Sequence, residues 1–193
     1  MTIPVFTVYA MIVGWFGFAG AMFTAKRHPG QVERRRERSS LPGLAVQMLS
    51  YSIVLSVRRP PGAPLLSQTI VPQALLCGLT LALIAGSVAM VVAAVRTLGK
   101  QWSLAARVIE GHELVTSGPY GLVRHPIYTG MLGMLVATGI AISTWWWLPA
   151  GAVLFLAGTL VRTRAEERLL RGQFGAAYEV YAARVPVLIP FIY

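Results

Sequence analysis

The chain contains no Asp and no Asn, and all seven of its acidic residues are Glu. These absences exclude a Ser-His-Asp triad, a metal or Mg²⁺-phosphate site built on Asp, and a hairpin that turns on Asn-Gly. The single Cys excludes an internal disulfide and a Cys-rich metal site. Charged residues are also scarce: they make up 12% of the 193 residues, whereas soluble domains carry about 25%. The composition therefore argues against an ordinary soluble domain.

Hydrophobic residues make up 55% of the chain, and 17 Lys and Arg residues give it a net charge of +10. High apolar content with excess positive charge is typical of two classes, membrane proteins and nucleic-acid binders. A nucleic-acid binder gathers its basic residues on one folded face, with aromatic residues between them. Here the basic residues occur in blocks between long uncharged stretches. The pattern favours a membrane protein in contact with lipids, and no nucleic acid is expected as a partner.

The uncharged stretches predict five membrane-spanning helices. Residues 3–24 are long enough, since a crossing needs about 20 apolar residues, and they lack the flanks of a cleaved signal peptide. Residues 41–57 form a shorter apolar run, and a third run extends from 60 to 95, with its apolar core from about residue 71 onward. Residues 126–161 are 36 uncharged residues, enough for two crossings that turn near Ser143 and Thr144.

The positions of Lys and Arg predict the orientation, because cytoplasmic loops hold most of the positive charge. Fifteen of the 17 basic residues lie in three regions that five spans place on one side: residues 26–38, residues 96–125 and the segment from 162 onward. Arg58 and Arg59 are the two on the other side. We therefore expect a polytopic, all-α integral membrane protein with about five transmembrane helices and its N-terminus outside.

A first polar cluster lies in the connector before the fourth predicted span, residues 99–130. Its glycines and prolines rule out a continuous helix, and connectors of this length in compact proteins are usually functional. Pro126 suits the first turn of the fourth helix, so Arg124 and His125 would lie beside a helix N-terminus, where the positive dipole favours anions. Tyr128, one turn further on, would direct its hydroxyl toward the same place.

A second polar cluster begins the C-terminal segment, where Arg162 and Glu166 are four residues apart and share one helix face. One interpretation is a surface ion pair, which contributes only about 0–1 kcal/mol. However, the pair lies at the end of the fifth span, on the same side of the membrane as His125, and ionisable residues at that depth are usually functional. We therefore expect the two clusters to face each other.

Further along this segment, apolar and aromatic residues recur at helical spacing. They are Leu170, Phe174, Tyr178, Tyr181 and Val185. This spacing predicts a C-terminal amphipathic helix on the cytoplasmic side, lying against the membrane face or the connector.

The residues of both clusters belong to five ordered blocks. The blocks are Gly118-Pro119-Tyr120, Arg124-His125-Pro126-Ile127-Tyr128-x-Gly130, Glu166-Glu167, Phe174-Gly175-x-x-Tyr178-x-x-Tyr181 and Arg184-Val185-Pro186-x-x-x-Pro190. In this order and at this spacing they resemble the isoprenylcysteine carboxyl methyltransferase family, over about residues 98–193. The first two spans carry no motif and resemble the family only in being spans.

The resemblance implies an S-adenosylmethionine-dependent methyltransferase that releases S-adenosylhomocysteine, in a single membrane domain over residues 1–193. Residues 1–95 would form three spans, and residues 96–193 the cofactor-binding, catalytic half, with its site on the cytoplasmic face. Carried over position by position, the cofactor contacts are His112, Glu113, Leu114, Val115, Tyr120, His125, Pro126, Ile127, Tyr128 and Glu166. Arg162 matches the family's substrate-binding Arg, and Arg162 and Glu166 form the expected catalytic pair.

One position departs from the family pattern. A Gln that contacts the cofactor in the eukaryotic members falls on Ala105 when the sequences are matched without gaps. Either Arg107 replaces this contact or the contact is missing.

The acceptor implied by the resemblance is lipophilic and enters from the bilayer, and we expect a carboxylate such as that of a prenylated cysteine. Methyl transfer from a sulfonium needs alignment and a dry site, and an ionised carboxylate needs no base. Arg162 would hold the carboxylate by paired hydrogen bonds, and Glu166 would place negative charge near the cationic cofactor. No metal is expected, and no protein partner is required. Phospholipid amines and small thiols remain alternative acceptors, because related architectures methylate them.

Two other functions remain open. The first is an NADPH-dependent membrane reductase of the sterol reductase type, because those enzymes share an R-H-x-N-Y-x-G block and a similar C-terminal ending; position 127 is Ile here rather than Asn, which favours the methyltransferase. The second is a non-catalytic membrane scaffold or a small transporter. A transporter would carry charged or strongly polar residues within several spans, whereas the predicted span interiors hold only Ser, Thr and Gln.

Overall fold

The computed structural model describes residues 3–23, 33–36, 38–60, 63, 72–102, 107–109, 111, 113–190 and 192. Its helices are α1 (Ile3–Phe23), α2 (Leu41–Ser56), α3 (Gln73–Leu98), α4 (Pro126–Ile142), α5 (Trp147–Phe174) and α6 (Ala176–Ala182). Short 3₁₀ turns lie at Arg38–Ser40, Gly99–Gln101 and Gly118–Gly121, and the two strands are β1 (Glu33–Arg36) and β2 (Arg107–Ile109). The helices confirm the predicted all-helical class.

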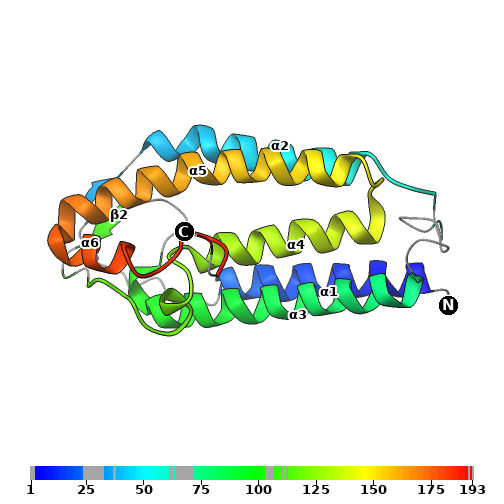
Figure 1. The fold of residues 1–193 in the computed structure, drawn as a ribbon, viewed down its shortest axis with the longest axis horizontal. Helices are drawn as coiled ribbons and strands as arrows, with labels where there is room; N and C mark the ends of the chain where they lie inside the picture. Colours follow the sequence, from blue (N-terminus) through cyan, green and yellow to red (C-terminus); the bar gives the residue numbers. More distant parts are fainter. Residues whose placement is uncertain are drawn as a thin grey trace.

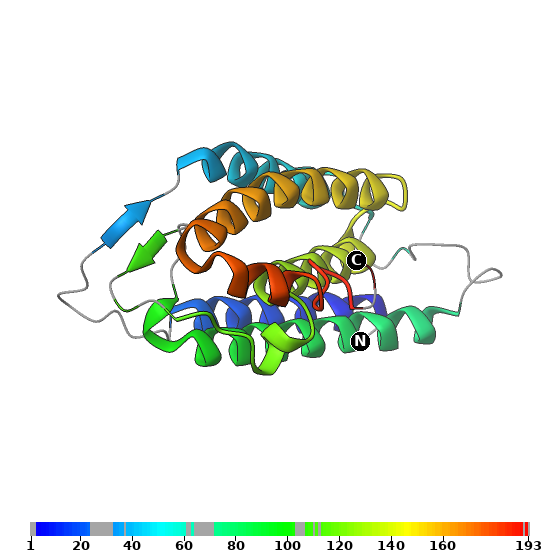
Figure 2. The same ribbon diagram turned by 60° about the vertical axis from the view of Figure 1, so that its left-hand side comes forward.

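The five long helices run side by side along the long axis of the molecule (Figure 1). Helices α2 and α5 pack together on one side, α1 and α3 on the other, and α4 lies between the two pairs and contacts all four. Helix α6 and strand β2 lie at one end of the bundle (Figure 1), and the two strands of the ribbon project side by side from that end (Figure 2). The long helices therefore form a bundle, and the polar connectors gather at one end of it.

Two of these helices meet the length and composition expected of a membrane span. They are α1 from Val5 onward and α3, while α2 and α4 are apolar but shorter. Helix α5 is 28 residues long, with an apolar first half and a second half that carries the charges of the second polar cluster. Helix α4 ends at Ile142 and α5 begins at Trp147, so the predicted turn near residues 143–144 is confirmed. The number of crossings and the outside N-terminus stay predictions.

The sequence did not predict the ribbon. Strand β1 pairs antiparallel with β2, and the register places Glu33 opposite Ile109 and Arg36 opposite Arg107. Each strand is only three or four residues long, which is too short for an alternating apolar pattern to identify it. The ribbon ties the loop between α1 and α2 to the connector before α4.

At the end of the bundle away from the ribbon, Arg59 holds the last turn of α4. Its Nη2 donates to the carbonyl oxygens of Ile140 and Ala141 at 2.7 and 2.9 Å, and its backbone N–H donates to the Ile142 oxygen at 2.9 Å. The last carbonyls of a helix have no partner within the helix. Arg59 satisfies three of them and fixes the loop after α2 against the end of α4.

Glycines allow α2 and α5 to approach until their backbones touch. A Cβ atom on Gly43 would lie 2.5 Å from the Gly158 carbonyl oxygen and 2.7 Å from Cγ of Arg162. A Cβ atom on Gly158 would lie 2.7 Å from the Gly43 oxygen and 2.9 Å from the Gln47 nitrogen. Small residues at such a crossing are a common means of close packing between membrane helices. The crossing fixes the register of α2 against the part of α5 that carries Arg162.

The predicted C-terminal amphipathic helix is divided into two in the structure. Leu170 and Phe174 belong to α5, whereas Tyr178 and Tyr181 belong to α6. The break falls at Gly175, whose φ of +52° is a left-handed conformation that favours glycine. The apolar face of the two helices nevertheless packs as one cluster with Val185 and with Leu114 of the connector.

The segment after α6 returns to the start of α4. The backbone N–H groups of Arg124 and His125 donate to the carbonyl oxygens of Pro186 and Val187 at 2.8 and 3.1 Å. The Thr129 hydroxyl donates to the Leu188 oxygen at 2.6 Å. These bonds hold the turn before α4 in one place, and the first polar cluster lies on that turn.

Candidate functional site

A cavity of about 410 Å³ lies where the connector, α4, α5 and α6 meet. Ten residues named from the sequence line it: Glu113, Leu114, Val115, Tyr120, His125, Pro126, Ile127, Tyr128, Arg162 and Glu166. His112 and Ala105 lie outside the described residues, and Arg107 belongs to β2 with its side chain outside the description. The two polar clusters expected to face each other therefore do so around one cavity.

Helices α1 and α2, which carry no motif, give the cavity an apolar wall. Phe18 and Met22 of α1 line it with Leu44 and Met48 of α2 and Met131 of α4. Leu44 and Met48 are 36% and 47% exposed, so this wall reaches the outer surface of the bundle. The cavity thus combines charged residues with a wall that suits a hydrocarbon group.

His125 occupies the turn before α4 and lies between two carboxylates. Its Nδ1 is 3.3 Å from Oε2 of Glu166, and its Nε2 is 3.4 Å from Oε1 of Glu167. Burial alone would lower the pKa of this histidine, but hydrogen bonds and charge from both carboxylates outweigh burial and raise it. Each ring nitrogen thus faces a carboxylate, an arrangement that favours the doubly protonated, cationic ring.

Glu166 joins the two clusters. The Tyr128 hydroxyl donates a hydrogen bond to Oε1 of Glu166. The hydroxyl thus points toward the first polar cluster, as the sequence predicts. Burial favours a raised pKa for Glu166, but the hydrogen bond and the charge of His125 overcome it, helped by Tyr128 and Arg162, and lower the pKa. The guanidinium of Arg162 lies over the Tyr128 ring, 4.9 Å from its centroid. Glu166 is therefore an ionised carboxylate on the wall of the cavity.

Glu167 is a structural partner that the sequence analysis did not assign to the site. Its Oε1 is 3.4 Å from Nη1 of Arg124, and its Oε2 is 3.2 Å from Nη2 of Arg171. Arg171 in turn donates from Nε to Oε1 of Glu179 in α6 at 2.9 Å. Its position directly after Glu166 could have identified it, since two consecutive glutamates can each reach one ring nitrogen of His125. Through these ion pairs Glu167 fastens the turn before α4 to α5 and α6.

Gln47 of α2 is a second residue that the sequence analysis missed. Its side chain is fully buried, and its Oε1 accepts a hydrogen bond from Nη1 of Arg162 at 2.9 Å. The signal was a lone amide side chain within the apolar stretch 41–57, because polar groups inside a span usually meet a specific partner.

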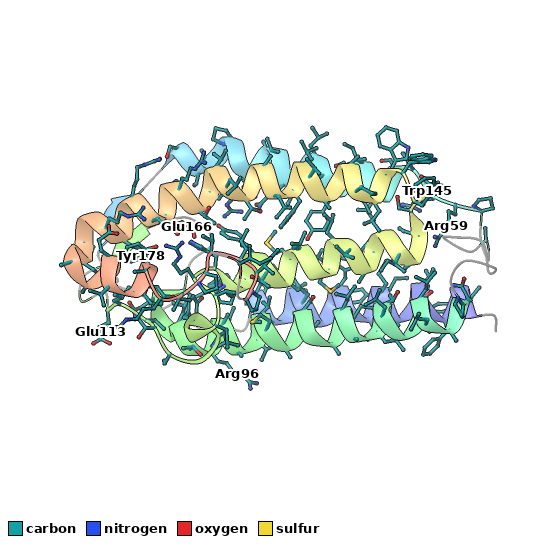
Figure 3. The ribbon with its side chains drawn as sticks, viewed as in Figure 1. Arg59, Arg96, Glu113, Trp145, Glu166 and Tyr178 are labelled. Carbon is teal, nitrogen blue, oxygen red and sulfur yellow. The ribbon has the colours of Figure 1, made fainter. Side chains whose placement is uncertain are left out.

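Tyr178 and Arg124 each bring to the cavity a polar atom that has no hydrogen-bond partner among the described residues. These atoms are the hydroxyl of Tyr178, which is fully buried, and Nε of Arg124. Burial, and then the charge of Glu167, raise the pKa of Tyr178 well above its ordinary value, so this hydroxyl keeps its proton. Figure 3 shows Tyr178, Glu166 and Glu113 at one end of the bundle, with Arg59 and Trp145 at the other. Buried polar atoms normally have a partner, so these two are suited to polar groups of a bound molecule.

Among the described residues, no three His, Cys or Glu side chains lie close enough together to hold a metal ion.

Comparisons with known proteins match about half of the chain, and the family model covers the half that carries this cavity's charged residues. A family model described as phospholipid methyltransferase matches residues 75–177. The chain is 35% identical over 105 residues to protein-S-isoprenylcysteine O-methyltransferase B of Arabidopsis thaliana, a stretch that covers 51% of each chain. It is 41% identical over 92 residues to methanethiol S-methyltransferase 2 of Bradyrhizobium diazoefficiens, which is 44% of this chain and 32% of that protein.

A reductase is also similar to part of the chain. The chain is 36% identical over 85 residues to the Delta(14)-sterol reductase TM7SF2 of Mus musculus, which is 43% of this chain but 20% of that protein. The chain spans about half the length of the isoprenylcysteine methyltransferase and less of the other two relatives.

Proposed function

Because the chain belongs to the phospholipid methyltransferase family, we propose that it is a membrane-embedded enzyme that transfers a methyl group from S-adenosylmethionine to a lipophilic acceptor. The observation that carries the proposal is the cavity: every expected cofactor residue whose side chain is described lines it. Apolar helices of span length and the family itself both indicate a membrane protein.

The residues of the cavity fit the proposed cofactor. S-adenosylmethionine, when bound, supplies a methyl group on a cationic sulfur. Ionised Glu166 favours a positive charge nearby. The Tyr178 hydroxyl and Nε of Arg124 offer hydrogen bonds to the polar groups of such a molecule. Glu113, Leu114 and Val115 supply a connector wall of mixed polarity, and these residues would hold the cofactor together with His125 and Tyr128.

Within this proposal, His125 is a fixed cation and not a general base. Both of its ring nitrogens face carboxylates, so it has no free lone pair with which to take a proton. A carboxylate acceptor has no proton to lose, so the reaction does not need His125 as a base. The work of the side chains is therefore to bind, to align and to keep water out.

Arg162 and the apolar wall support a lipophilic anion as the acceptor. The guanidinium binds carboxylates well because its N–H groups pair with both oxygens. Phe18, Met22, Leu44 and Met48 provide the apolar surface for a hydrocarbon chain, and Leu44 and Met48 are exposed at the outer surface of the bundle. We propose that a prenylcysteine-like carboxylate enters from the membrane through this wall, with the cofactor side of the cavity on the cytoplasmic face.

The direct test is transfer of a labelled methyl group from S-adenosylmethionine to a panel of acceptors by the purified chain. The panel contains a prenylcysteine acid, a long-chain thiol and a phospholipid amine, each with the same hydrocarbon length. We expect the acid to be methylated fastest. Transfer to none of the three would contradict the proposed function, and a preference for thiol or amine would change the acceptor class.

A reductase remains the second candidate because of the similarity to the sterol reductase. Titration of the purified chain with S-adenosylhomocysteine and, separately, with NADPH distinguishes the two. We expect saturable binding of S-adenosylhomocysteine. Tight binding of NADPH alone would favour the reductase, and binding of neither would favour a non-catalytic scaffold.

A further inference from the structure

A polar side chain from the half of the chain without motifs contacts Arg162 of the site. Gln47 of α2 is fully buried, and its amide lies against the guanidinium of Arg162 on α5, 115 residues away in sequence. We infer that Gln47 is a positioning residue for Arg162 that sets the affinity for an anionic acceptor. This inference rests on the proposed function, since it assumes that Arg162 binds the acceptor.

The hydrogen bonds around Gln47 determine which way its amide points. The Thr159 hydroxyl donates to the Phe155 carbonyl oxygen at 2.8 Å, so its oxygen is left to accept a bond. Nε2 of Gln47 donates to that oxygen at 2.7 Å. The amide oxygen must then face Arg162, whose guanidinium can only donate. Both ends of the amide are satisfied, so Gln47 and Nη1 of Arg162 occupy a single arrangement.

The crossing of α2 and α5 makes this arrangement rigid. Gly43 lies one turn before Gln47 and contacts the backbone of Gly158, which lies one turn before Arg162. Because the two backbones touch there, neither helix can slide without a clash. The amide therefore reaches Arg162 from a fixed distance, and the arginine side chain is held before any acceptor arrives. Such preorganisation lowers the entropy lost on binding.

The neutral charge of Gln47 matters as much as its position. A glutamate at this place would also accept a hydrogen bond from Arg162, and its negative charge would compete with an acceptor carboxylate for the same guanidinium. An amide orients the guanidinium without cancelling its charge. Gln47 thus leaves the positive charge of Arg162 directed toward the cavity.

The test compares binding of an acid with binding of its neutral ester. The probes are an N-acetyl-S-prenylcysteine and its methyl ester, titrated against the detergent-solubilised full chain. We expect Gln47→Glu to weaken binding of the acid by about tenfold or more while the ester changes by about twofold or less, because one competing charge near a buried guanidinium corresponds to at least about one factor of ten. Gln47→Leu should weaken the acid less, since it removes the orienting bond but adds no charge.

Two further variants keep the test decisive. Thr159→Val removes the hydroxyl that orients the Gln47 amide and keeps the volume of the side chain, so it should weaken acid binding. It provides the test even where Gln47→Leu fails to fold. Ser50→Ala is the matched control. Ser50 is buried on the same helix, and its hydroxyl donates to the Gln47 backbone oxygen and not to the side-chain amide. The control should leave both affinities unchanged. Affinity for S-adenosylhomocysteine should stay the same in all four variants.

The outcomes separate this inference from the proposed function. If Arg162→Ala leaves binding of the acid unchanged, the assigned role of Arg162 is wrong and the inference fails with it. If Arg162→Ala weakens the acid but Gln47→Glu and Thr159→Val do not, the inference alone is wrong. If Gln47→Glu weakens binding of the acid and of the ester equally, Gln47 has a purely structural role, and this result would also overturn the inference.

Discussion

A single imidazole connects the two carboxylates of the site. His125 lies outside the predicted spans, between Glu166 and Glu167, whose hydrogen bonds and charge raise its pKa against the effect of burial. Replacing either carboxylate leaves a buried cation with one partner, which is costly because an unpaired buried charge loses its solvation without compensation. The ring is therefore the point at which pH acts most directly on the fold of the site.

The stability of the folded chain should depend on pH through these three groups. The pKa of His125 is raised, so its contribution is fully present below the ordinary value of 6.5 and is lost as the pH rises through the raised pKa. The pKa values of Glu166 and Glu167 are lowered, so their contribution is present above 4.5 and is lost as the pH falls through the lowered values. We expect the Tm in detergent to decline on the alkaline side of 6.5 and on the acid side of 4.5.

The variant His125→Gln provides the control for this profile. An amide keeps hydrogen bonding at the position but does not titrate, so the alkaline decline should flatten while the overall Tm drops. An alkaline decline of the same size in the variant would show that other groups cause it.

Glu166→Gln should weaken binding of the methyl donor more than binding of its product. The sulfur of S-adenosylmethionine is cationic, whereas that of S-adenosylhomocysteine is neutral, and only the first gains from the carboxylate. A hydrogen bond or close contact to a charged group contributes about 1.5–3 kcal/mol, so we expect an affinity loss of about tenfold or more for the donor. Isothermal titration of both molecules measures the difference. Glu179→Gln is the matched control on the same side of the molecule, since Glu179 is exposed and pairs with Arg171.

Part of the site could be predicted from single residues. Arg124, His125 and Tyr128 were identified because a proline start and helix spacing place them together, and Glu166 because it shares a helix face with Arg162. The partners Glu167 and Gln47 were missed, because their roles depend on contacts 42 and 115 residues away. A local pattern can mark such a residue as unusual, but it does not identify the distant partner.

At the scale of elements, the crossing of α2 and α5 decides how the site is held. Gly158→Ala should destabilise the chain, because the added Cβ would lie 2.7 Å from the Gly43 oxygen and 2.9 Å from the Gln47 nitrogen. Both are backbone atoms that cannot rotate away. Overpacking of this kind costs about 1–3 kcal/mol, and unfolding in a denaturing detergent measures it.

Gly86→Ala is the matched control for this prediction. Gly86 lies within α3, and a Cβ there meets nothing within 4 Å. The substitution should leave stability unchanged or raise it slightly, since Ala restricts the unfolded chain more than Gly. Equal behaviour of the two alanine variants would show that the crossing does not limit how close the helices approach.

Element boundaries were predictable where composition changes sharply. The turn between α4 and α5 follows from the polar Ser143 and Thr144 in an apolar run. The break at Gly175 was not predicted, because the apolar residues keep their helical spacing across it. The spacing alone does not show that the chain changes direction between α5 and α6. The ribbon was missed for the opposite reason, since three or four residues are too few to show a pattern.

For the whole molecule, the predicted orientation places the cavity end in the cytoplasm and the Arg59 end outside. A chain with Cys77→Ser and a new cysteine tests this. Glu179→Cys, whose side chain is 59% exposed, should react with a membrane-impermeant maleimide only from the cytoplasmic side, and Trp145→Cys, at a residue 45% exposed, only from outside. The labelling of both from one side would contradict the five-span topology, and labelling after permeabilisation is the control.

The walls of the cavity come from two halves of the chain with different kinds of sequence. The charged wall lies within residues 75–177, where the family model matches, whereas Phe18, Met22, Leu44 and Met48 lie before it. Substitutions in α1 and α2 can therefore reshape the apolar side of the cavity without altering a single residue of the matched region. Under the proposed function, changes in α1 and α2 would alter the acceptor side of the cavity and leave its donor side as it is.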